Sequence, residues 1–247
     1  MARRDGDGPG SPFARPAFIA SAVFLAAVLA GGAWLALGPR PGAPAPAPPA
    51  SAPAAPAAGP ASSGPAAAVS DSVCGLPAGD QEPPDSALGP ATVRVGDGLA
   101  VPSVQGVGPG VTAGGVSRCF AHSPTGAVVA AANFIVWLSS NQRLDEVTTT
   151  LIAAGADRDR MLAEVRSSWD GSTSPAFAVV GYKVEVRSPD EALVTIAASP
   201  ASDRSRAVAW PLVMVWADGD WKVKPPSNGR WGQTAVTGVS GFIPWGA

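Results

Sequence analysis

The stretch VGYKVEVRSPDEALVTIAA, residues 180–198, decides the fold of this chain. Apolar residues occupy every second position of 180–186, and Gly, Lys and Glu lie between them. A Pro-Asp turn signal follows, and the alternation resumes over 192–198. A period of two is typical of β-strands with one buried face. The stretch therefore predicts two antiparallel strands joined by a tight turn.

The residues that follow continue this pattern. Alternation over 206–217 predicts a third strand, in which Pro211 indicates an edge position or a bulge. Asp218 and Gly219 form a hairpin signal, and Trp221 begins a fourth strand. The sequence thus predicts an antiparallel meander.

Helical patterns precede the strands. The strongest one covers 127–138, which is apolar apart from one asparagine. Ser123 can cap this helix, and Pro124 suits its first position. Because the helix is apolar on nearly every side, we expect it to be buried on most faces. Two further helices are predicted over 142–154 and 158–169. Helices followed by a meander predict an α+β fold, with helices packed on a curved antiparallel sheet.

Residues 16–38 are predicted to form a single transmembrane helix. They contain no charged residue, and 17–37 would span about 31 Å as a helix, close to the thickness of a bilayer. The arginines of the stub, residues 1–15, favour a cytoplasmic N-terminus and an extracytoplasmic C-terminal domain. A cleaved secretory signal over the same residues is the alternative. Both interpretations place the rest of the chain outside the cytoplasm.

A proline-rich tract follows, residues 39–70, with ten prolines among Ala, Gly and Ser. This composition cannot bury a core, so it predicts a disordered linker with extended conformations. We interpret the linker as a spacer, with a docking site for proline-binding modules as the alternative. The remaining chain divides into an irregular wrapping segment at 71–118, an α+β domain at 119–225 and a C-terminal tail at 226–247.

Cys74 and Cys119 are the only cysteines, and we expect them to form a disulfide. Compartments outside the cytoplasm are oxidising, and a bond would pin the otherwise irregular segment 71–118. The bond would close a loop of about 45 residues and contribute about 4 kcal/mol in the chain-entropy model. Two free buried thiols are the alternative.

The sequence predicts no catalytic, cofactor-binding or metal-binding residue. His122 is the only histidine, and we expect a structural or exposed role for it rather than a catalytic one. One histidine and two bonded cysteines do not supply a metal-binding set. Asp218 and Asp220 flank a glycine, and turn chemistry explains both. Residues 71–247 carry 17 acidic and 13 basic side chains without a basic cluster, which argues against nucleic-acid binding.

Three stretches together resemble an uncharacterised family of actinobacterial single-pass membrane proteins. They are CGLP at 74–77, CFAHSPTGAVVAAAN at 119–133 and WADGDWK at 216–222, and the resemblance covers about 71–225. The order of helices and meander is also similar to the nuclear-transport-factor-like cone fold, or cystatin-like fold. That fold recurs in the extracytoplasmic domains of scaffold subunits of type IV secretion and conjugation machinery. This resemblance implies a similar architecture, at the level of fold analogy.

We therefore expect a membrane-anchored extracytoplasmic scaffold or assembly protein, such as a component of a conjugation or secretion apparatus, and not an enzyme. A ligand-binding or catalytic cone-fold domain at the cell surface is the alternative. The expected partners are the membrane, through one helix, and either a second copy or another envelope protein. Trp231, Phe242 and Trp245 lie among glycines in the tail and are candidate contact residues. The tail packing back on the sheet is the alternative for these three.

Overall fold

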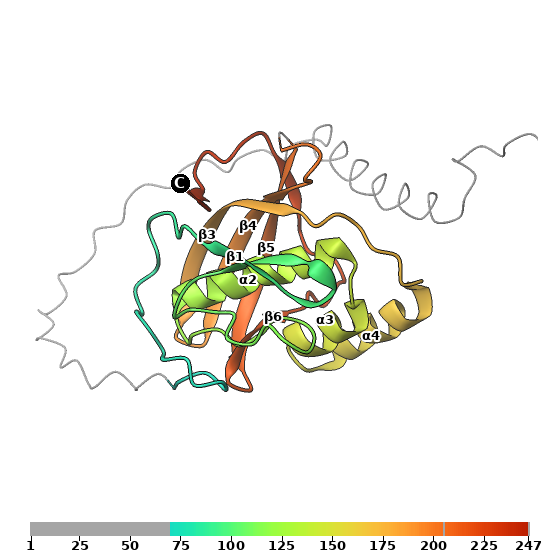
Figure 1. The fold of residues 1–247 in the computed structure, drawn as a ribbon, viewed down its shortest axis with the longest axis horizontal. Coiled ribbons are helices and arrows are strands. Elements are labelled where there is room, and N and C mark those ends of the chain that lie inside the picture. The colour runs from blue at the N-terminus through green and yellow to red at the C-terminus, as the bar shows by residue number, and fades with distance from the viewer. Residues whose placement is uncertain (1–69, 205, 247) are drawn as a thin grey trace, which may run out of the picture. The chain divides into compact units, whose positions relative to one another are not determined.

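The computed structural model describes residues 70–204 and 206–246, which form an α+β domain (Figure 1). The predicted stub at 1–15, the predicted transmembrane helix at 16–38 and nearly all of the predicted linker lie outside the described residues. Within 70–204 and 206–246, no helix has the length and apolar character needed to cross a membrane.

The main sheet contains the predicted meander. Its strands are β3 (Ala178–Ser188), β4 (Glu191–Ser199), β5 (Ala207–Ala217), β6 (Asp220–Lys224), β7 (Thr234–Val236) and β8 (Ile243–Pro244). Four of them lie in the order β6-β5-β4-β3, every neighbouring pair is antiparallel, and β8 extends the sheet beside β3. The four strands and both hairpin turns predicted from the alternation are confirmed.

The predicted bulge at Pro211 is absent, because β5 pairs with β4 without a register shift, and the predicted edge position occurs only locally, within a strand that lies between β4 and β6. On one side of β5, Pro211 is opposite Thr195 of β4. On the other side, β6 pairs with 213–217 and β7 pairs with 207–209. Pro211 therefore lies in the gap between two short partner strands. A residue without an N–H group suits such a gap, because no ladder bond is made there.

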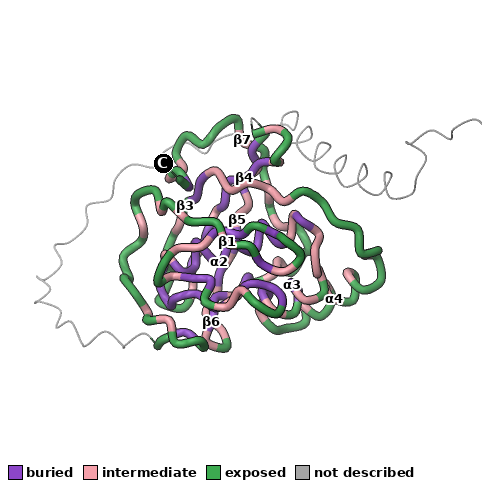
Figure 2. The backbone as a smooth tube through the Cα atoms, in the orientation of Figure 1, coloured by how far each residue is buried: buried purple, intermediate pink, exposed green. Residues whose placement is uncertain are grey.

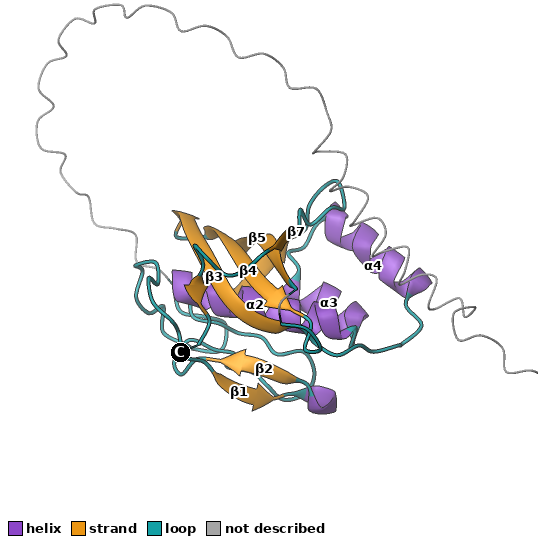
Figure 3. Ribbon diagram, turned by 90° about the horizontal axis from the view of Figure 1, so that it is seen from above, coloured by secondary structure: helices purple, strands orange, loops and turns teal. Residues whose placement is uncertain are grey.

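The helix α2 (Pro124–Ser140) is the centre of the domain. The Ser123 side chain caps it, accepting a hydrogen bond from the Gly126 N–H at 3.1 Å. Fourteen of its 17 residues are buried, as the apolar sequence predicts. The main sheet packs on one side of α2 and a β-hairpin lies on the other (Figures 2 and 3). Two covering layers explain why this helix has no polar face.

The second covering layer is a hairpin of β1 (Ala91–Arg94) and β2 (Ala100–Ser103), joined through a 3₁₀ turn at Gly96–Gly98. This hairpin lies within 71–118, which the sequence predicts to be an irregular wrapping segment. One buried hydrogen bond attaches this layer to α2, and a second joins α2 to the segment that precedes it. The Asn133 side chain donates to the Pro102 carbonyl at 2.9 Å and accepts from the Ser117 hydroxyl at 2.9 Å.

The other two helices differ in extent from the prediction. They are α3 (Leu144–Leu151) and α4 (Ala156–Ser168). The helix predicted to reach residue 154 ends at Leu151, because Ile152 is extended and bridges to Val223 of β6. The Ala153 N–H then donates to the Val223 carbonyl at 2.9 Å. Pairing with a buried strand therefore ends the helix earlier than the sequence pattern does.

Tyr182 of β3 provides a test of this packing, because it is the only tyrosine in the chain. Its hydroxyl donates to the Ser86 carbonyl at 2.7 Å. Burial, and secondarily the Asp85 carboxylate, raise the pKa of Tyr182 to about 12. The folded state thus favours the neutral phenol. The stability that the buried neutral phenol contributes is complete below the ordinary tyrosine pKa of about 10. It is lost as the pH rises through 12.

We expect an absorbance titration of the phenolate band to give a midpoint near 12 for the folded protein. In concentrated urea the midpoint should fall to about 10, the value of an exposed tyrosine. A folded midpoint equal to the one in urea would contradict the burial of this side chain.

Candidate functional site

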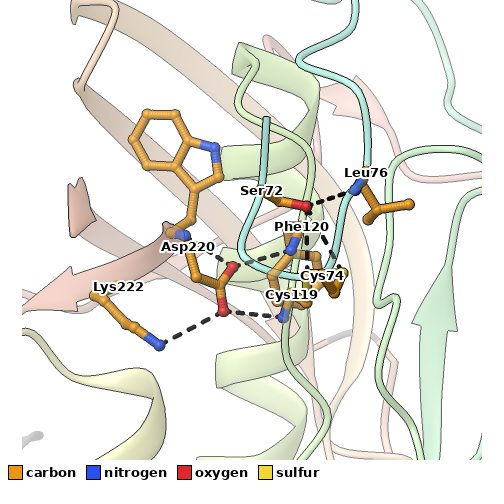
Figure 4. Close-up of a disulfide and its surroundings, with 8 residues drawn as sticks. Ser72, Cys74, Leu76, Cys119, Phe120, Asp220 and Lys222 are labelled. Carbon is orange, nitrogen blue, oxygen red and sulfur yellow. Dashed lines mark hydrogen bonds and ion pairs between the residues drawn. A yellow bond between two sulfur atoms is a disulfide. The ribbon is translucent and has the colours of Figure 1, made fainter. Parts of the chain in front are cut away.

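The disulfide between Cys74 and Cys119 is present, which confirms the predicted pairing. Figure 4 shows the disulfide cluster, which we define as Ser72, Cys74, Cys119, Asp220 and Lys222 with their backbone partners. The Ser72 hydroxyl lies 3.4 Å from the Cys119 sulfur and 3.6 Å from the Cys74 sulfur. It also accepts a hydrogen bond from the Leu76 N–H at 2.8 Å. The cluster fastens the start of the described chain to the segment that precedes α2.

Asp220 is the central acceptor of this cluster, and its side chain is 2 % exposed. Its carboxylate accepts hydrogen bonds from the N–H groups of Cys119, Phe120 and Trp221, each at 2.9 Å (Figure 4). The Lys222 ammonium lies 3.5 Å from the same carboxylate. Turn chemistry therefore accounts for Asp218, at a positive φ of 55°, but not for Asp220. Asp220 connects the β5–β6 hairpin to a segment 100 residues away in sequence.

His122 is buried next to this cluster. Its ring stacks on Trp216 with a centroid separation of 3.8 Å. Asp190 Oδ1 lies 2.9 Å from Nε2, an ion-pair distance without hydrogen-bond alignment. The Ser70 carbonyl oxygen lies 3.1 Å from Nδ1, closer than the Ser70 hydroxyl at 3.5 Å. Asp190 and Ser70 belong to other segments of the chain, so both ring nitrogens of His122 lie at contacts between segments. Among the described residues, no group of three or more His, Cys, Asp or Glu side chains is arranged to bind a metal ion.

The three candidate contact residues pack against the domain in the structure. Trp245 is 9 % exposed and meets Tyr182 edge to face at a centroid distance of 6.1 Å. Trp231 lies 5.5 Å from the ring of Phe134 in α2. The Lys183 ammonium lies 4.4 Å above the ring of Phe242. Phe242 and Trp245 thus contact residues of β3, whereas Trp231 contacts α2.

An open groove lies between the β1–β2 hairpin, the beginning of β3 and the end of the tail. Its volume is about 610 Å³. The lining comes from 89–92, 99–102 and 176–179, together with Val136 and Trp245–Gly246. No lining side chain carries a charge. Sequence reasoning missed this groove, because two of its walls, the β1–β2 hairpin and the beginning of β3, are more than 70 residues apart and neither has a distinctive motif.

A second, smaller groove of about 300 Å³ lies over β5 and β6, with Trp231 on one wall. Asp157, Arg187, Glu191 and Lys224 contribute charges of both signs to its lining. The larger groove has no charged lining, and this uncharged groove is the candidate binding site.

Fold and site define a disulfide-bonded α+β domain with an open, uncharged groove. Residues 41–244 match the model of a family described as a domain of unknown function, DUF8175. The chain belongs to this family, because the match covers most of its length. No curated protein and no solved structure matches it.

Proposed function

We propose that this protein is a membrane-anchored scaffold or assembly protein whose domain acts outside the cytoplasm through contact rather than catalysis. The uncharged groove is the observation that carries this proposal, because an open groove whose lining has no charge suits contact with another molecule. The disulfide supports an oxidising compartment. The charge-free run at 16–38 supports a single membrane anchor with the N-terminus in the cytoplasm.

The finer assignments belong to the same proposal. The order of helices and antiparallel meander supports a fold of the cone or cystatin-like type. Partners in this proposal are other envelope proteins, including a second copy of the chain. A conjugation or secretion assembly is the specific case, and it rests on the fold analogy alone.

Photo-crosslinking in intact cells tests the proposal. A photoreactive residue is introduced into the full chain at Thr92, an exposed residue of the groove. The matched control carries the same residue at Ala163, which is exposed on α4 and outside the groove. We expect discrete adducts in the membrane fraction from position 92 and none from position 163.

Two results would count against the proposal. Absence of any adduct at position 92 would refute contact through the groove. Recovery of the full chain from the soluble fraction would refute the anchor.

A further inference from the structure

The lining of the uncharged groove suits an extended peptide without charged residues. Charged side chains make up 15 % of the chain, yet none of them lines this groove. Phe177 and Trp245 contribute aromatic surface, and Pro90 and Pro102 contribute further apolar walls. Burying a charged group in such lining would cost free energy that no partner offsets.

The shape of the site also favours an extended segment. In the described sheet, β8 pairs with β3 only at Gly181 and Tyr182, and the Trp245 N–H donates to the Val180 carbonyl. No described strand pairs with Ala178 or Val179 on that edge, and both residues line the groove. An extended segment that makes no ladder bonds can therefore lie in the groove, and polyproline II segments bind aromatic-lined grooves in this way.

The chain itself contains a segment with this chemistry. Residues 41–69 consist of Pro, Ala, Gly and Ser with a single Val, and they include no charged residue. Proline-rich segments favour the polyproline II conformation, which aromatic-lined grooves recognise at a low entropic cost. The family match begins at residue 41, so the tract and the domain belong to one family pattern.

We propose that the uncharged groove binds the proline-rich tract, residues 41–69, of a second copy of this chain. The inference rests on the proposed function and identifies the partner as this protein itself. Each copy then offers one groove and one tract, so the contact is heterologous and can continue from copy to copy. Confinement to one membrane raises the local concentration and allows a weak contact of this kind to act.

Two complementary variants of the full chain test this proposal. One replaces 41–69 with a Gly-Ser sequence of equal length, which leaves only the groove. The other, Ala91→Glu, places a charge on an exposed groove residue and leaves only the tract. Ala163→Glu on α4 is the matched control for adding a charge. Self-association is followed by sedimentation equilibrium in mild detergent, and urea unfolding verifies that each variant folds.

We expect the natural chain and Ala163→Glu to associate equally. Each complementary variant alone should associate at least 10-fold more weakly, and mixing the two should restore a one-to-one complex. A mixture that remains monomeric would overturn the proposal, as would unchanged association of either variant. If the adducts formed at position 92 in cells contain a different protein and never a second copy of this chain, this inference is overturned. The proposed function would then remain intact.

Discussion

Asp220→Ala is expected to lower the free energy of unfolding by about 3–5 kcal/mol, the range found when one partner of a buried, hydrogen-bonded ion pair is removed. The carboxylate accepts from three backbone N–H groups, two of which belong to Cys119 and Phe120. Removing it leaves these donors buried without an acceptor, since both residues are 0 % exposed. Urea unfolding of the oxidised protein, followed by fluorescence, measures the change.

Asp218→Asn is the matched control, because it removes one negative charge from the same hairpin. Asp218 is exposed and has a positive φ, which asparagine tolerates. We expect this variant to change the free energy of unfolding by less than about 0.5 kcal/mol. Equal losses in the two variants would show that net charge, rather than the buried hydrogen bonds, explains the effect at Asp220.

Removal of the disulfide is expected to lower the free energy of unfolding by about 4 kcal/mol in the chain-entropy model. Cys74 and Cys119 are 45 residues apart in sequence, and the bond limits the unfolded chain over that loop. The double variant Cys74→Ala, Cys119→Ala and the reduced natural chain should therefore unfold at similar, lower urea concentrations.

Reducing agent should not change the stability of the double variant, which makes it the control for the reduced natural chain. If the oxidised and reduced natural chains unfold at the same urea concentration, the disulfide does not stabilise the domain. The losses of stability caused by replacing Asp220 and by removing the disulfide should not be additive. The reason is that the Asp220 carboxylate accepts a hydrogen bond from the Cys119 N–H. Replacing Asp220 in the reduced chain should therefore cost less than in the oxidised chain.

The fold class could be predicted because the local patterns agree with the final packing. The alternation over 180–198 predicts two strands with one buried face each, and both strands occur. The helix signal at 127–138 is apolar all round, and α2 is covered on two sides. The cysteine pairing also followed from the sequence, since only two cysteines are present.

Several features depend on residues that are distant in the sequence, so no local pattern could predict them. Helix α3 ends at Leu151 because Ile152 meets Val223. Pro211 is tolerated inside the sheet because β6 and β7 leave a gap beside it. In both cases the partner that decides the outcome is brought close only by folding.

The sequence by itself determined the periods of the helices and strands, the single cysteine pair and the absence of charge along 16–38 and 41–69. Only the tertiary structure decided the role of Asp220 and the existence of the groove. An acidic residue after a glycine has the same local appearance whether it faces solvent or three buried N–H groups. Likewise, the walls of the groove are ordinary apolar segments that become a site only where two layers of the fold meet. Local sequence fixes backbone periodicity, whereas burial and hydrogen-bond partners are properties of the packed chain.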